Sequence, residues 1–190
     1  MKPEGLIESI RQRLMNLSRE NGEAFDFVLA RYAVERFLYR LSVSGHADQF
    51  VLKGSMLFHV WNRRMHRPTR DLDLFSSMRT YPACTVVAEK FEALVRLDAQ
   101  NTRMKDFFDL DLLLKSDPPD RELLSNAIRA TFKRRGSDLP TEVPTGLTEE
   151  FAREKQVMWN AFLRKNSLVS DDLSEVLGQI RSGLEWIWKE

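Results

Sequence analysis

The chain has 190 residues, of which 43% are hydrophobic and 30% are charged, and its formal net charge is +1. This length can bury a core in one or two domains, and the composition excludes a disordered or fibrous chain. The balanced charge neither requires nor excludes a nucleic-acid partner. The single cysteine, Cys84, rules out a disulfide within the chain and fits the reducing cytoplasm, where we expect the protein.

Two helices are expected at the N-terminal end. Residues 4–20 form a charged amphipathic pattern, unlike a signal peptide, and no apolar run in the chain is long enough to span a membrane. Residues 25–43 carry apolar side chains at helical spacing. We expect the inner face of this helix to hold Phe27, Ala30, Val34, Phe37, Leu38 and Leu41.

A strand, a helix and a second strand are predicted next, at residues 50–52, 55–62 and 71–75. Residues 76–83 are expected to be a connector, because nothing in them predicts a further strand. The strand count is therefore low.

Helices dominate the rest of the chain. Breaks at Pro118-Pro119 and in the Pro- and Gly-containing linker at 136–147 separate them, and Thr148 is a predicted N-cap. The expected helices are 85–97, 103–115, about 120–134, 148 to about 165 and about 171–188. The predicted fold class is α+β and predominantly helical, with an N-terminal core at residues 1–83 and a helical domain at residues 84–190.

Two motifs in the N-terminal core carry chemistry. Asp71 and Asp73 alternate with leucines in the predicted strand, so both carboxylates point to one face, where a pair of this kind suits Mg²⁺. The Gly54-Ser55 turn opens a predicted helix, whose free N–H groups suit a phosphate. Alternatively, the turn is a simple N-cap and the aspartates are a solvated strand face. Together the motifs indicate phosphoryl or nucleotidyl transfer.

Two predicted helices place charges in their apolar faces. Lys90 falls within the apolar arc of the helix at 85–97, where it either extends to water or reaches a phosphate. In the helix at 103–115, Arg103 falls in the apolar face with Asp106 beside it. These two form either a structural ion pair or part of a polar pocket that Lys90 shares.

Asp109 is a weaker candidate for the site. It follows Lys105 by four residues, so we expect an ion pair between them on the exposed side of the helix. The two helices are expected to pack as an antiparallel pair, with Lys90 and Asp106 directed toward the strand that carries the paired carboxylates.

With these motifs in order, the chain resembles the nucleotidyltransferase toxins of the AbiEii/AbiGii type, from type IV toxin–antitoxin and abortive-infection systems. The likeness covers most of residues 25–190. The matching segments are residues 50–55, 70–74, 85–93, 103–110, 151–156, Trp159 and 161–163. The resemblance implies a reduced DNA-polymerase-β-like core with a C-terminal helical part. It also implies transfer of a nucleotide from NTP to an acceptor, such as tRNA, with Mg²⁺, and a cognate antitoxin as a possible partner.

The resemblance, taken with the motifs, assigns roles to individual residues. Asp71 and Asp73 are the expected metal ligands, and Asp106 completes the site. The expected nucleotide-binding residues are Lys53, Gly54, Ser55, Arg70 and Lys90, and the expected catalytic residues are Asp71, Asp73, Lys90 and Asp106. The basic cluster of Arg63, Arg64, Arg67 and Arg70 either contacts RNA phosphates or is a solvated loop.

The chain departs from the family in one place. Relatives have several dozen more residues between the Asp-x-Asp strand and the helix that carries the lysine, whereas only residues 76–84 bridge that gap here. The insert builds further strands and often carries another acidic residue. A second hypothesis is therefore a catalytically impaired remnant that binds nucleotide or an antitoxin. A nuclease is less favoured, because no histidine that could act as a general base stands near the carboxylates.

Overall fold

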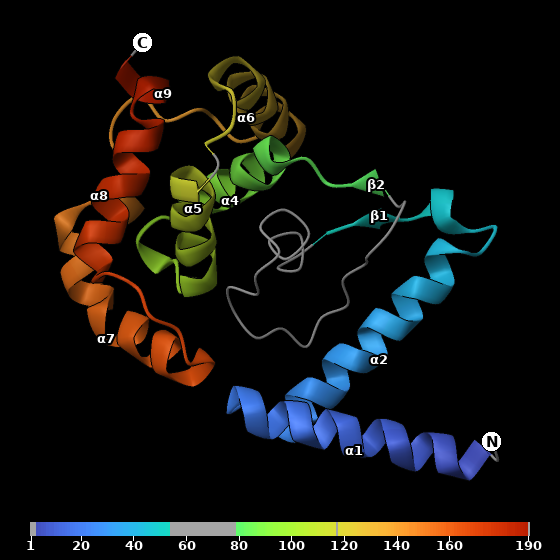
Figure 1. The fold of residues 1–190 in the computed structure, drawn as a ribbon. Coiled ribbons are helices and arrows are strands. Elements are labelled where there is room, and N and C mark those ends of the chain that lie inside the picture. The colour runs from blue at the N-terminus through green and yellow to red at the C-terminus, as the bar shows by residue number, and fades with distance from the viewer. Residues whose placement is uncertain (1–2, 54–78, 117, 190) are drawn as a thin grey trace. The chain divides into compact units, whose positions relative to one another are not determined.

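A computed structural model of the chain describes residues 3–53, 79–116 and 118–189. The chain divides into two compact units, residues 1–80 and 81–190. The described residues are predominantly helical, which confirms that part of the predicted fold class (Figure 1). The helix predicted at 55–62 and the strand predicted at 71–75 lie outside the described residues.

The first unit begins with a helical hairpin made of α1 (Pro3–Asn21) and α2 (Phe25–Ser42). Gly22 ends α1 with a φ of +65°, a left-handed conformation that suits glycine at this position. The Ser18 hydroxyl donates to the Glu23 carbonyl at 2.6 Å and so closes the turn. Both predicted helices are therefore present.

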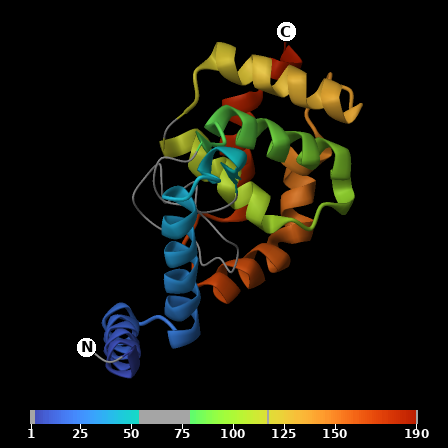
Figure 2. The ribbon, with the colours of Figure 1, turned by 90° about the vertical axis from the view of Figure 1, so that its right-hand side faces the viewer.

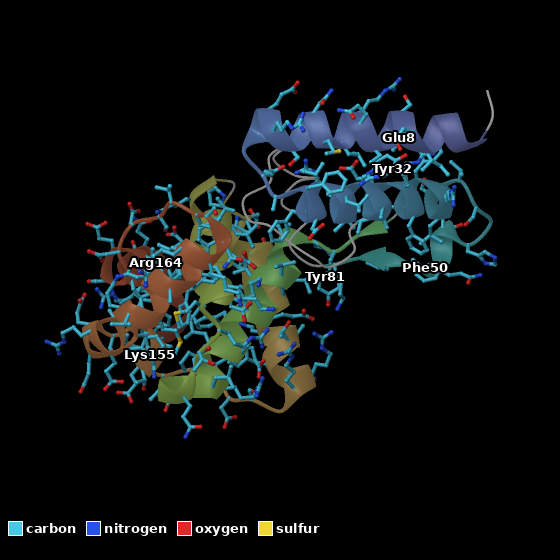
Figure 3. The ribbon with its side chains drawn as sticks, turned by 90° about the horizontal axis from the view of Figure 1, so that it is seen from below. Glu8, Tyr32, Phe50, Tyr81, Lys155 and Arg164 are labelled. Atoms are coloured by element: carbon cyan, nitrogen blue, oxygen red, sulfur yellow. The ribbon has the colours of Figure 1, made fainter. Side chains whose placement is uncertain are left out.

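The inner face of α2 differs from the prediction. Leu38, which we expected on that face, is buried, but Phe27 and Phe37, which we also expected there, are 39% and 51% exposed, and Val28, from outside the predicted set, is buried. The buried side of α2 therefore overlaps the predicted face only in part. The reason is that α2 has apolar side chains on several sides, so spacing alone did not identify the side that packs. Figure 3 shows α1 and α2 side by side, with Tyr32 between them.

A short parallel pair of strands completes the described part of this unit. After η1 (Ala47–Gln49), β1 (Val51–Leu52) pairs with β2 (Arg79–Thr80), and Val51 lies opposite Arg79. The connector predicted at 76–83 therefore contains a strand. Two residues are too few to produce a recognisable alternation.

The second unit contains most of the described helices. They are α4 (Ala83–Leu97), η2 (Asp98–Gln100), α5 (Met104–Ser116), α6 (Arg121–Arg135), η3 (Thr145–Leu147), α7 (Glu149–Asn166), α8 (Leu173–Leu184) and α9 (Trp186–Lys189). The predicted helices correspond closely to these, except that the last one is divided into α8 and α9. Side chains cap three of the helices, as hydroxyl or carboxylate oxygens of Asp120, Thr148 and Asp172 accept backbone N–H bonds at the helix starts.

Helix α5 lies at the centre of the second unit. It packs against α4 on one side and against α7 and α8 on the other, and α6 lies along α4 (Figure 2). Aromatic side chains fill the interior: the rings of Phe91 and Phe132 are 5.7 Å apart, and the ring of Phe107 is 5.5 Å from that of Phe151. Charged groups on the α4 side of α5 are therefore held inside a packed protein interior. Among the described residues, none of the helices has the length and apolar character needed to cross a membrane.

Candidate functional site

A cluster of four charged side chains joins α4 to the start of α5. The Lys90 ammonium donates to Asp106 Oδ1 at 2.7 Å and to Asp109 Oδ2 at 2.8 Å. The other oxygen of Asp106 lies 2.7 Å from Arg103 Nε. Two cations and two carboxylates thus alternate, and we call these four residues the Lys90 cluster.

Contacts to Glu89, the residue before Lys90 in α4, fix the neighbourhood of Lys90. The Tyr81 hydroxyl donates to Glu89 Oε1 at 2.7 Å, and Arg134 from α6 donates to the same oxygen at 3.0 Å. Figure 3 labels Tyr81 beside the start of α4. The Lys90 side chain is only 17% exposed, so most of its stem is covered by protein. Of the two sequence interpretations, extension into water is wrong, because the ammonium reaches carboxylates inside the unit.

The turn before α5 positions Arg103 and Asp106. Asn101, which is 1% exposed, accepts the backbone N–H of Arg103 at 2.9 Å with its side-chain oxygen. Asp106 then falls in the first turn of α5, where the partial positive charge of the helix N-terminus favours a carboxylate. The predicted pairing of Arg103 with Asp106 is confirmed. Arg103 itself precedes the helix and is 46% exposed, so it does not belong to the apolar face where we placed it.

The prediction that Asp109 lies on the exposed side of the helix is wrong. Its side chain is buried and pairs with Lys90, whereas Lys105 is exposed on the surface of α5. The spacing of four residues suggested a surface pair, but Asp109 also lies three residues after Asp106 and therefore shares its face of the helix. That second spacing was the signal that could have found it.

Sequence reasoning also missed Glu92, which is fully buried on α4. Its carboxylate accepts hydrogen bonds from Arg96 Nε at 3.1 Å, from Ser137 Oγ at 2.7 Å and from Arg135 Nη1. Burial raises the pKa of Glu92, but the bonds from Ser137 and Arg135 and the charges of Arg135 and Arg96 outweigh it, so the pKa is lowered overall. This network joins α4 to the end of α6 and is structural.

Of the remaining predicted site residues, all of which belong to the first unit, the structure describes Lys53 alone. Lys53 is exposed and directly follows the carboxyl end of β1. The other residues, Gly54, Ser55, Arg63, Arg64, Arg67, Arg70, Asp71 and Asp73, lie outside the described residues. The structure therefore brings together Lys90, Arg103 and Asp106, and it adds Asp109 and Asn101.

The two carboxylates of the Lys90 cluster hold the ammonium group of Lys90 and not a metal ion. The Lys90 ammonium already lies between the two carboxylates. Within residues 3–53, 79–116 and 118–189, no group of three or more His, Cys, Asp or Glu side chains is arranged to hold a metal ion. An ammonium group has three donors, and two of them contact Asp106 and Asp109. Within the described residues the structure gives Lys90 no third carboxylate, so one donor is left for an anion such as a phosphate.

Comparison with known proteins decides the family. The family described as nucleotidyl transferase AbiEii toxin, type IV TA system, matches residues 36–77 and 75–188. The chain belongs to the AbiEii family. The first matched segment includes Gly54, Ser55, Asp71 and Asp73, and the second includes the whole Lys90 cluster.

The AbiEii match comes in two segments, as expected if part of the family's sequence is missing between them. The junction, at residues 75–77, coincides with the short link where we expected the internal deletion. No match was found among curated proteins or among solved structures.

Proposed function

We propose that this chain is an Mg²⁺-dependent nucleotidyltransferase of toxin type that transfers a nucleotide from NTP to RNA, with tRNA as the first acceptor to test. Membership of the AbiEii family supports the reaction class. The observation that carries the proposal to individual residues is the Lys90 cluster, a lysine held by two buried aspartates. A reduced DNA-polymerase-β-like core, a cytoplasmic location and a cognate antitoxin are parts of the same proposal.

In this reaction an acceptor hydroxyl oxygen bonds to the α-phosphorus of the NTP, loses its proton, and pyrophosphate leaves. Negative charge is spread over the phosphate oxygens, and catalysis depends on positioning and electrostatics. Lys90 would place its ammonium against that charge. Asp106 would act through Lys90, because it holds the ammonium at 2.7 Å.

The nucleotide and metal residues of the proposal come from the first matched segment. Lys53, Gly54, Ser55 and Arg70 would bind the phosphates. The donor chemistry of Asp71 and Asp73 fits Mg²⁺, which is usually bound by one or two carboxylates together with substrate phosphates. When bound, the ion would neutralise phosphate charge and orient the triphosphate.

A second candidate function is a nucleotide- or antitoxin-binding remnant. The observation that favours it is the family match in two segments, which meet between Asp73 and the helix that carries Lys90 and are consistent with a gap there. Loss of an acidic ligand there would weaken the binding of a second metal ion. In two-metal sites such an ion activates the attacking hydroxyl. We therefore expect nucleotide binding to survive better than catalysis.

The test is incubation of the purified protein with each labelled NTP, Mg²⁺ and total tRNA. Transfer of label that the substitution Asp71→Ala abolishes would establish the enzyme. Undetectable transfer by a protein that still binds NTP would instead favour the remnant. Absence of both binding and transfer would contradict the enzyme and the nucleotide-binding remnant.

A further inference from the structure

One side of α2 is exposed along almost the whole length of the helix. Its residues recur every three or four positions, so they lie on a single face. They are Asp26, Leu29, Ala33, Phe37 and Arg40, and all five are exposed. We call these five residues the α2 seam.

The α2 seam lies opposite the side of the helix that packs. At 100° per residue, the centre of the seam is about 180° from the mean direction of the buried residues Val28, Leu38 and Ser42. The seam nevertheless contains two large apolar side chains, Leu29 and Phe37, which are 43% and 51% exposed. Apolar side chains that share an exposed face, with charged residues at its ends, are typical of an interaction surface.

The two ends of the seam carry opposite charges. Asp26 lies in the first turn of α2, and Arg40 lies in its last turn. Within the part of the chain that the structure describes, neither side chain makes a hydrogen bond or an ion pair. Both charges are therefore available to a partner.

The order of side chains along the seam is complementary to its own reverse. Leu29 and Phe37 lie four residues to either side of Ala33, and Asp26 and Arg40 lie seven residues to either side of it. If two copies of α2 cross antiparallel at Ala33, Leu29 of each copy lies opposite Phe37 of the other. Asp26 of each copy then lies opposite Arg40 of the other. A parallel arrangement places Arg40 opposite Arg40, where like charges repel.

We propose that the α2 seam joins two copies of this chain as an antiparallel helix pair, with a twofold axis at Ala33. The interface is isologous, because each copy contributes the same face. Leu29 and Phe37 form its apolar centre, Asp26 and Arg40 form its polar rim, and the small side chain at the crossing lets the helices approach closely. So small an interface gives a weak dimer, with a dissociation constant on the order of 10 μM. This inference goes beyond the proposed function and does not depend on it.

The first test is sedimentation velocity of the full chain over a concentration series that brackets this value. We expect wild type to change from monomer to dimer across the series. Arg40→Asp places two carboxylates opposite each other at both ends, so it should raise the dissociation constant at least about tenfold. The double variant Asp26→Arg, Arg40→Asp exchanges the two charges and should restore the dimer. Arg13→Asp, the same change at an exposed position of α1, is the matched control and should have no effect.

Two results of this experiment would overturn the proposal. One is a wild-type chain that stays monomeric throughout the series, as it would if the seam bound a different protein instead. The other is a dimer that Arg40→Asp does not weaken or that the double exchange does not restore, because the charged ends would then lie outside the interface.

The second test locates the twofold axis. A cysteine on the axis faces the same cysteine of the other copy, so Ala33→Cys should form an intermolecular disulfide on mild oxidation. The experiment uses a Cys84→Ser background, which removes the only native cysteine. Glu8→Cys, exposed on α1, is the matched control and should cross-link far more slowly. Equal rates for the two variants would indicate random collision and contradict the proposed axis.

Discussion

Glu92 shows how one buried side chain joins separate segments of the second unit. Its two oxygens receive hydrogen bonds from α4 itself, from the end of α6 and from Ser137 just beyond it. Gly136, between the last two, has a φ of +65° and turns the chain so that Ser137 can reach the carboxylate. The charge of Glu92 is therefore a stabilising feature of the fold.

We expect Glu92→Gln to destabilise the protein by about 1–3 kcal/mol at pH 7, because a charge-assisted network loses its anion. The pKa of Glu92 is lowered in the folded state, so its contribution is present above the unfolded-state pKa and is lost as pH falls through the folded-state pKa. The difference between wild type and variant should thus shrink below about pH 4. Urea unfolding at pH 7 and at acid pH measures it, and a difference independent of pH would contradict this account.

At the scale of elements, η3 can pack closely on α4 because Gly146 has no side chain. A Cβ added to Gly146 would lie 3.1 Å from Leu94 Cδ2 and 3.3 Å from Leu94 Cγ. Leu94 is 1% exposed and packed in the core, so it has little room to move. Gly146 therefore sets how closely the segment before α7 packs on α4.

We expect Gly146→Ala to lower the free energy of unfolding by about 1–3 kcal/mol through overpacking. The matched control is Gly178→Ala in the interior of α8, where an added Cβ meets nothing within 4 Å. This control should stabilise the helix by about 0.5–1 kcal/mol, because alanine is the better helix former. Denaturant unfolding of both variants tests the pair, and destabilisation by both would mean that the space around Gly146 is not the cause.

At the scale of the whole molecule, the second unit has a hydrophobic core of its own. Its core aromatic residues, including Phe91, Phe107, Phe132 and Trp159, are buried. Two side chains of α7 bind the backbone at the start of α8. Trp159 Nε1 donates to the carbonyl of Asp171, just before α8, at 3.0 Å, and the side-chain oxygen of Gln156 accepts the Leu173 N–H at 3.0 Å.

We therefore expect a fragment of residues 81–190 to fold by itself. Circular dichroism should show a helical fragment that unfolds cooperatively, and Trp159 fluorescence should follow the same transition. A fragment of residues 1–80, in which few apolar side chains of the described residues are buried, serves as the comparison. A gradual, non-cooperative unfolding of fragment 81–190 would show that its core is insufficient.

The proposed site makes a prediction for the full chain. An NTP at about 100 times its dissociation constant should add about 2.7 kcal/mol of stability and raise the melting temperature by several degrees. This should occur only with Mg²⁺, because the metal screens the phosphates from Asp71 and Asp73. Thermal melting with NTP in Mg²⁺ and in EDTA measures the effect, with Asp71→Ala as the control. Equal stabilisation in both conditions would exclude the metal bridge.

Much of the helical architecture was predictable from the sequence, because helical spacing, caps and breaks are local signals. Thr148 marked the start of α7, and Pro118-Pro119 separated α5 from α6. The pairing of Arg103 with Asp106 was predictable for the same reason, since the two are neighbours along the chain. The family resemblance, which depended on motifs in order along the sequence, is confirmed by the family match.

The tertiary structure decided which side of each helix is buried and which charges meet. Phe27 and Phe37 have suitable spacing for an inner face, yet packing against α1 selects another side of α2. Asp109 has a nearby lysine at Lys105, yet it is buried against Lys90 from another helix. Local spacing limits the possible partners of a side chain. A buried charge is unfavourable unless it is paired, and the packing of α4 on α5 determines which partner Asp109 contacts.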